Sequence, residues 1–267
     1  MFWERVRGMG RIVLKMMQVL FVGMMFALEV EGIKGNGWLN GHATYYGASQ
    51  NPTTLGGACG YDNTAHAGFG VNTAAVSGAL FGGGEACGAC FQVTCDARAD
   101  PKWCIARAAV TVTVTNFCPA NNNGGWCDFP RVHFDMSLPA FSRVARVGSE
   151  GIVPILYRRV SCKRVGGVRF TLKGQGNFNL VMFTNIGGSG AVKAAWVKAS
   201  SSSSSSSSWA SMQRNWGANW QTNADFRNQA LSFKLLLTDG KTLEFPYVVP
   251  PTWIFGQTFI SRRQFSN

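Results

Sequence analysis

Alternation of apolar and polar positions predicts strands in the first half of the chain. Residues 108–115 (AAVTVTVT) alternate strictly and are β-branched, which is typical of a half-buried strand. Residues 152–157 form a second candidate strand. Residues 139–147 (PAFSRVARV) have helical spacing and are the best helix candidate, while the Asn/Gly-rich residues 121–125 indicate a loop.

The second half has the same β character. Residues 168–172 alternate, and residues 180–183 form a short apolar run. Residues 231–238 and 241–245 flank Asp239-Gly240, which suits a two-residue hairpin turn because Gly accepts a positive φ. Several short strands over about 100 residues indicate a small β-sandwich.

The N-terminus predicts secretion. Basic residues between 5 and 15 precede an apolar run at 16–28, and Gly32 follows soon after. This order is typical of a secretory signal peptide, which we place at 1–32, and the run is shorter than the roughly 20 residues of a membrane span. A signal anchor is the alternative.

Composition indicates a folded, basic protein. Hydrophobic residues make up 46% and charged residues 14%, which excludes a disordered chain. The net charge is +12, and removal of residues 1–32 leaves 21 − 10 = +11. This charge favours an acidic partner, such as nucleic acid, anionic lipid or acidic polysaccharide.

The cysteines predict disulfides and a division of the chain. All eight lie between Cys59 and Cys162. An even count in a secreted chain favours disulfides over zinc, since Cys87-x-x-Cys90 has no second metal-binding pair. Eight cysteines allow 105 pairings, so the spacing alone does not assign them. The asymmetry predicts a stapled domain at 33–165 and a cysteine-free domain at 167–265.

Two features are candidates for chemistry. Asp135 stands out in His133-Phe134-Asp135, although a helix cap or a surface acid would look the same. No nucleophile elbow, phosphate-binding loop or zinc-protease motif is present. The second half carries an excess of tryptophans, which either pack in the core or stack on sugar rings: Trp196, Trp209, Trp216, Trp220 and Trp253. A single-stranded nucleic-acid binder would combine the same charge and aromatics, but secretion and disulfides oppose it.

Ordered motifs between residues 42 and 259 carry a family resemblance. They include HATYYG at 42–47, GGACGY at 56–61, CGACF at 87–91, TNFCP at 115–119, GGWC at 124–127, HFD at 133–135, RNWG at 214–217 and FGQTF at 255–259. On these motifs the chain resembles the plant α-expansins.

The resemblance implies an all-β fold of two domains. A six-stranded double-psi β-barrel, related to family-45 endoglucanases, would precede an immunoglobulin-like β-sandwich that binds cellulose. It also implies the disulfides Cys59–Cys87, Cys90–Cys162, Cys95–Cys104 and Cys118–Cys127. The implied activity is non-hydrolytic loosening of plant cell walls.

The resemblance assigns Asp135 to the position of the general acid of the related endoglucanases. An inverting glycosidase needs a second carboxylate to activate water. In those enzymes it follows a Thr-x-Tyr motif, but here Thr44-Tyr45-Tyr46 is followed by Gly, Ala and Ser. Thr44, Tyr46 and His133 remain expected groove residues. Asn116 stands where some relatives have Asp, and it cannot act as a base.

In the second domain, Trp216 and Phe178 match the aromatic platform of the family. Trp209 and Trp220 are secondary candidates. Nine serines at 200–208 indicate a flexible loop insertion just before Trp209 and put the role of Trp209 in doubt.

The expected function is therefore a secreted, wall-loosening protein of the plant cell wall. Its expected partners are cellulose and xyloglucan-type glucans, with acidic pectins attracted by the basic charge. We expect a monomer with no metal or cofactor, no nucleic-acid partner and at most peripheral membrane association. The alternatives are a weak endoglucanase that uses Asp135 and a plain carbohydrate-binding or defence protein.

Overall fold

The computed structural model describes residues 37–47, 56–148, 151–200 and 208–266. The expected signal peptide at 1–32 lies outside these residues, as do seven of the serines, 201–207. Within the described ranges, no helix has the length and apolar character needed to cross a membrane.

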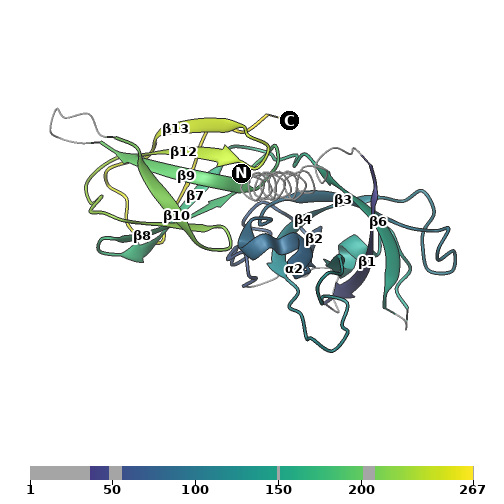
Figure 1. Ribbon diagram of the computed structural model, residues 1–267. Helices are drawn as coiled ribbons and strands as arrows, with labels where there is room; N and C mark the ends of the chain where they lie inside the picture. Colours follow the sequence, from purple (N-terminus) through teal and green to yellow (C-terminus); the bar gives the residue numbers. More distant parts are fainter. Residues whose placement is uncertain (1–36, 48–55, 149–150, 201–207, 267) are drawn as a thin grey trace, which may run out of the picture. The chain divides into compact units, whose positions relative to one another are not determined.

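The first half of the described chain forms a closed six-stranded barrel (Figure 1). The strands follow one another around it in the order β1-β5-β2-β4-β3-β6. Their bounds are β1 (Leu39–Tyr46), β2 (Thr73–Val76), β3 (Cys90–Cys95), β4 (Val110–Phe117), β5 (His133–Ser137) and β6 (Val153–Val160). The strands predicted at 108–115 and 152–157 are thus confirmed as β4 and β6, each shifted by one to three residues.

Alternation separates the barrel core from the outer wall. On β5, Phe134 and Met136 are fully buried in the core, so the side chain of Asp135 between them projects to the other face. Phe134 packs edge-on against Phe91 and lies 5.2 Å from Tyr157, ring centroid to ring centroid. The apolar positions therefore fix which side of the wall carries the polar residues.

The helix predicted at 139–147 is largely wrong. The helix α3 comprises only Leu138–Phe141. Beyond it, the Ile105 amide donates to the Val144 carbonyl and the Arg146 amide donates to the Trp103 carbonyl. Because these groups pair with a distant segment, they are not available for a helical ladder. Two further short helical segments, α2 (Gly78–Phe81) and η2 (Gly82–Gly84), follow β2.

Four disulfides staple the barrel and its loops. The pairs are Cys59–Cys87, Cys90–Cys162, Cys95–Cys104 and Cys118–Cys127, as the family resemblance implied. Closing loops in this way limits the freedom of the unfolded chain and so stabilises a fold with many long connections.

The second half forms one eight-stranded antiparallel sheet that folds into two layers. Its order is β13-β12-β9-β10-β11-β8-β7-β14. The bounds are β7 (Arg169–Gln175), β8 (Phe178–Thr184), β9 (Val192–Ala199), β10 (Ala210–Trp216), β11 (Asn219–Asn223), β12 (Leu231–Leu237), β13 (Thr242–Val249) and β14 (Thr258–Ile260). Strand β10 pairs with β9 through its first residues and with β11 through its last, so it belongs to both layers.

Aromatic packing between the layers makes this domain a β-sandwich. Phe170 and Phe183 come from one layer and Phe233 and Phe245 from the other, and all four are almost fully buried. Phe170 lies 5.1 Å from both Phe233 and Phe245, ring centroid to ring centroid. The predicted sandwich is confirmed, and so is the turn at Asp239-Gly240, where Gly240 has a φ of 84°.

Candidate functional site

The outer wall of the barrel carries a row of polar residues centred on Asp135. Thr44 on β1 pairs with Asp135 on β5, Asp135 pairs with Ala75 on β2, and Ala75 pairs with Asn116 on β4. Residues directly opposite in neighbouring strands share a face of the sheet. We call Thr44, His133, Asp135, Ala75 and Asn116 the Asp135 face.

Thr44 connects His133 to Asp135. The Thr44 hydroxyl donates to Asp135 Oδ1 at 2.8 Å, and His133 Nε2 lies 2.8 Å from the same hydroxyl oxygen. A hydroxyl has one proton to donate, so His133 must be the donor in the second contact. This assigns the neutral tautomer with its proton on Nε2, and it leaves Nδ1 buried with no partner among the described residues.

Burial shifts the pKa values of the two titratable groups in opposite senses. It raises the pKa of Asp135, and the hydrogen bond from Thr44 opposes this in part. Burial, and then the charge of His42, lowers the pKa of His133 to about 4. Both shifts favour the uncharged side chain. Asp135 therefore keeps its proton, and with it the ability to donate a hydrogen bond, to a higher pH than an exposed Asp does.

The other described acids of the barrel interact elsewhere. Asp62 forms an ion pair with Lys173 at 2.8 Å. Three carboxylates accept backbone hydrogen bonds: Asp96 from Arg98, Asp100 from Trp103, and Asp128 from Asn121, Asn122 and Gly125. The charge of Glu85 partly offsets the lowering of the Arg214 pKa by burial. Glu150 lies outside the described residues. Among the described acids, Asp135 alone faces Thr44 and His133.

Tyr46 and Asn116 flank the Asp135 face. Tyr46 follows Thr44 by two residues on β1, and its hydroxyl lies 2.9 Å from Thr73 Oγ1. Asn116 Oδ1 accepts hydrogen bonds from the amides of Ala58 and Phe117, at 2.7 and 2.9 Å. The structure thus brings together all the site residues expected in the barrel, and it gives Asn116 the additional task of holding the loop at Ala58.

Trp126 is a further candidate site residue that the sequence pattern did not indicate. It is 44% exposed, and its ring lies 4.5 Å from the ring of His42, centroid to centroid. His42 precedes Thr44 by two residues on the same face of β1 and pairs with His133. An exposed tryptophan therefore extends the Asp135 face. Only its position in a disulfide-closed loop beside the strand residues could have indicated this role.

Trp216 lies against the loop that Asn116 holds. Gly60 in this loop has a φ of 78°, and a Cβ there would collide with the Trp216 ring and with Asn219. The Ala218 amide also donates to the Cys59 carbonyl at 3.0 Å. Trp216 is nevertheless 46% exposed. One loop, held by Asn116 of the barrel, thus contacts this exposed tryptophan of the sandwich.

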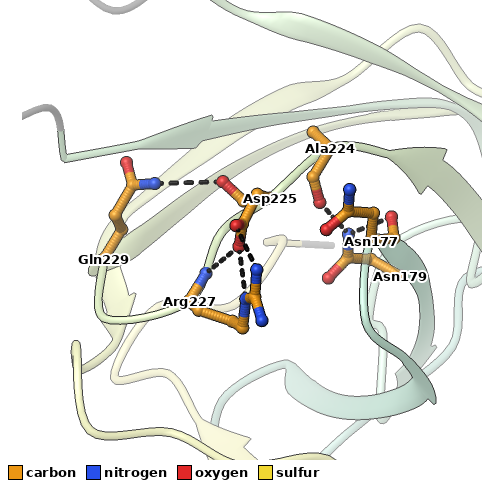
Figure 2. Close-up of polar contacts among 6 residues, drawn as sticks. All are labelled: Asn177, Asn179, Ala224, Asp225, Arg227 and Gln229. Atoms are coloured by element: carbon orange, nitrogen blue, oxygen red, sulfur yellow. Dashed lines mark hydrogen bonds and ion pairs between the residues drawn. The ribbon is translucent and has the colours of Figure 1, made fainter.

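Phe178 is held at the start of β8 by its two neighbours. The Asn179 side chain donates to the carbonyls of Asn177 and Ala224, at 3.0 and 2.8 Å (Figure 2). The Ala224 amide donates back to the Asn177 carbonyl. Phe178 itself is 39% exposed and pairs with Asn223 at the far end of β11 from Asn219.

Side-chain contacts also order the loop that follows Ala224. Arg227 forms an ion pair with Asp225, and the Gln229 side chain donates to the Asp225 carbonyl (Figure 2). These bonds order the loop between β11 and β12, to which Ala224 belongs. This loop thereby stabilises the backbone around Phe178, because its residue Ala224 bonds to Asn177 and Asn179.

Trp220 is not a surface residue, and this candidate is wrong. It is 4% exposed and belongs to the sandwich core, where Arg214 lies 4.6 Å from its ring. The face of β11 that carries Trp220 packs into the sandwich core, and Asn219 on the opposite face is also buried, so neither position lies on the surface. Trp209 is half-buried just before β10, with Lys198 and Lys234 each 5.0 Å from its ring. It therefore lies at the opposite end of β10 from Trp216.

Comparisons with known proteins match this architecture. Residues 168–250 match the model of the expansin C-terminal domain, and residues 73–157 match a model described as lytic transglycolase. Expansin-A12 of Arabidopsis thaliana is 63% identical over 88% of this chain and 92% of its own length. Expansin-A13 of Oryza sativa subsp. japonica is 47% identical over 90% and 92%.

A solved structure supports the fold. The apo expansin of Clavibacter michiganensis has a TM-score of 0.64 at 21% identity and covers 86% of this chain and 99% of its own. A mutant of that bacterial expansin was solved in complex with cellohexaose. A six-stranded barrel followed by a β-sandwich is thus the fold that this chain shares with a solved expansin. With the identities above, the chain belongs to the plant α-expansin family.

Proposed function

We propose that this protein is secreted to the plant cell wall, binds cellulose and xyloglucan-type glucans, and loosens the wall without hydrolysis. The family membership and the cellohexaose complex of the bacterial expansin support glucan binding. In this proposal, residues 33–165 provide the Asp135 face and residues 167–265 provide the aromatic surface. The expected monomeric state and the attraction to acidic pectins belong to the same proposal.

The observation that carries the non-hydrolytic part is the isolation of Asp135. General-acid catalysis of glycoside cleavage by inversion needs a base on the opposite side of the sugar. The other described acids of the barrel are engaged elsewhere, and the sequence holds no Asp or Glu between Tyr46 and Tyr61. Asp135 then serves as a binding group.

The mechanism follows from the protonation of Asp135. Thr44 donates to Oδ1, and Oδ2 has no hydrogen-bond partner among the described residues, so Oδ2 of the protonated carboxyl can donate to a glucan oxygen. Such a bond replaces one between neighbouring glucan chains. Trp216 and Phe178 stack on glucose rings through their exposed faces, and Trp126 adds a third ring beside the Asp135 face.

The test is creep of heat-killed wall strips under constant load, with reducing sugar assayed in the same bath. We expect extension without release of reducing ends. Steady release that is lost in Asp135→Asn would show instead a weak endoglucanase. Binding to cellulose without any extension would indicate a plain carbohydrate-binding protein.

A further inference from the structure

A cleft lies between the barrel loop at 61–67 and the outer face of the sandwich. Its volume is about 420 Å³, within the range of roughly 300–1,000 Å³ that is usual for ligand sites. Five residues of the loop line one side, and residues of β7, β8 and β14 line the other. Both sides belong to the compact unit that begins at Leu39. We call it the Thr171 cleft, after the central residue of its floor.

The floor is a row of side chains across three strands. Thr171 on β7 pairs with Met182 on β8 and with Thr258 on β14, so the three side chains share one face of the sheet. This is the outer face, because Phe170 and Leu172 on either side of Thr171 are buried in the sandwich core. The cleft therefore opens on the outside of the sandwich.

Hydrogen bonds and an ion pair hold the loop beside this floor. Asp62 pairs with Lys173 at 2.8 Å, and the Arg169 side chain donates to the carbonyl of His66. Asn63 Oδ1 accepts from the backbone amides two and three residues further along, at 2.9 and 3.0 Å. The wall of the cleft is thus built from groups that are fixed in place.

The cleft offers hydrogen bonds to an uncharged ligand. Thr171 Oγ1 and Thr258 Oγ1 lie 2.8 Å apart, and their bond uses one of the two hydroxyl protons, so the other can be donated to a ligand. The Asn63 side chain makes its described hydrogen bonds through Oδ1, which leaves its amide protons for a ligand. The charged residues of the described lining are one acid and one cation, Asp62 and Arg169, so no excess charge favours an ion.

The cleft suits a single sugar unit better than the main chain of a glucan. A main chain stacks on open aromatic faces, but the Tyr61 ring in the wall is buried and packs edge-on against Phe69, 4.5 Å away between ring centroids. Ile260 is 62% exposed and adds an apolar side chain. A sugar unit has hydroxyls for the Thr and Asn groups and a C–H face for this isoleucine.

Phe178 lies on the same outer face as the cleft. Phe178 and Met182 are four residues apart on β8, so alternation places both on this face. At about 3.3 Å per residue, the two positions are roughly 13 Å apart along the strand. A glucan that stacks on Phe178 can therefore extend a branch toward the cleft.

We propose that the Thr171 cleft binds a neutral sugar branch of a matrix glucan and thereby makes the protein prefer branched over unbranched chains. Thr171, Thr258 and Asn63 bond to hydroxyls of the branch, and Ile260 contacts its C–H face. The inference rests on the proposed function for glucan binding itself, which assigns no residue to the recognition of branches.

Calorimetry with the full-length secreted protein tests this proposal, using cellotetraose and cellotetraose with three xylosyl branches as separate probes. We expect the branched probe to bind at least about tenfold more tightly. Thr171→Val/Thr258→Val should reduce this preference at least about fivefold, because two hydroxyls are lost while the shape is kept. The matched control Thr111→Val/Thr242→Val changes exposed strand positions elsewhere and should keep the preference. Binding to pure cellulose should be equal in all three proteins.

A further variant covers the case in which the double variant does not fold. Thr258→Gln changes an exposed position and fills the cleft with a longer side chain, so it should also remove the preference. Equal affinity of the parent for the two probes would refute the proposal while leaving glucan binding intact. A preference that persists in Thr258→Gln, or that is lost equally in the control, would place branch recognition elsewhere. Absence of binding to either probe and to cellulose would refute the proposed function, and this inference with it.

Discussion

Thr44 and Asp135 face each other across the parallel pair β1 and β5, with the Thr44 hydroxyl donating to Asp135 Oδ1 at 2.8 Å. His133 donates to the same hydroxyl from the other side. This arrangement orients the carboxyl and fixes which of its oxygens is occupied. It also couples the Asp135 face to a histidine that stays neutral in mildly acidic conditions.

Replacing Asp135 should change both the rate of wall creep and its dependence on pH. Burial raises the pKa of Asp135, so the protonated donor persists to higher pH than in an exposed Asp and is lost as pH rises further. Asp135→Ala should reduce wall creep to less than about a tenth at every pH, as expected from loss of a buried hydrogen-bonding group. Any creep that remains in Asp135→Asn should be independent of pH, because an amide donates throughout.

The control for this prediction is Asp239→Asn, in the exposed turn between β12 and β13, where the amide oxygen still accepts from Lys241. Its creep should follow the parent at each pH. Creep of folded Asp135→Ala at the parental rate would contradict the assignment of Asp135.

His133 should make the protein less stable as pH falls. Its pKa is about 4 in the folded state against 6.5 for the free side chain. The contribution to stability is therefore complete above pH 6.5 and is lost as pH falls toward 4, with a maximum of about 3 kcal/mol. His133→Gln should lack this loss, so its free energy of unfolding should rise relative to the parent over that interval.

Denaturant unfolding at a series of pH values measures this difference, and the opposite contribution of Asp135 is common to both proteins and cancels. His66→Gln, at a histidine exposed to solvent, should keep the parental profile. A parent and a His133→Gln variant with parallel profiles would show that His133 does not titrate as assigned.

Local alternation predicted two of the six barrel strands, β4 and β6. β-branched alternation at 108–115 sufficed for β4, whereas no sequence pattern predicted β5, the strand that carries Asp135. The failed helix at 139–147 had good helical spacing. Pairing of Val144 and Arg146 with Trp103 and Ile105 is a contact between distant segments, which periodicity does not reveal.

The aromatic residues show the same limit. Trp216 and Trp220 lie four residues apart in similar surroundings, yet a bulge at β10 and the reversal into β11 leave one exposed and bury the other. Trp126 depends on a contact with His42 more than 80 residues away in sequence. The side of a strand is set by register, and register is set by partners.

Trp216→Ala should therefore weaken cellulose binding, whereas Trp220→Ala should lower the stability of the sandwich. Loss of the exposed ring of Trp216 should weaken cellulose binding several-fold, since stacking on an aromatic ring is worth ~1–3 kcal/mol for bases and we take sugars at the lower end. Trp220→Ala should instead cost about 3–5 kcal/mol of stability, as for other buried aromatic residues. Cellulose pull-down at high salt and thermal unfolding distinguish the two effects.

Phe178→Ala should resemble Trp216→Ala, with weaker binding and a nearly unchanged unfolding temperature. If Trp216→Ala unfolds the sandwich while its affinity in folded protein stays parental, Trp216 is a packing residue. If cellulose binding disappears in salt while Trp216→Ala binds normally, charge and not stacking holds the protein on cellulose.

Trp126→Ala should reduce wall creep more than it reduces binding to pure cellulose, because Trp216 and Phe178 remain to stack on glucose rings. The ring borders the Asp135 face through His42, so its loss should act on the same step as loss of Asp135. Combining Trp126→Ala with Asp135→Ala should therefore give no further loss of creep. A fully additive double variant would place Trp126 in a separate step.

Gly60→Ala should disturb the loop that Asn116 holds and that contacts Trp216. A methyl group at Gly60 would collide with Trp216 and Asn219, whereas one at Gly70 would meet nothing within 4 Å. Both glycines have a positive φ, 78° and 67°, so both variants carry a similar backbone cost of about 1 kcal/mol. A difference in cellulose affinity between the two variants therefore measures the effect of the collision with Trp216 and Asn219 alone. Gly60→Ala should lower cellulose affinity several-fold, measured by depletion of the protein from solution by cellulose. Gly70→Ala should keep the parental affinity and lose only stability. Equal affinity in the two variants would show that the position of Trp216 does not depend on this loop.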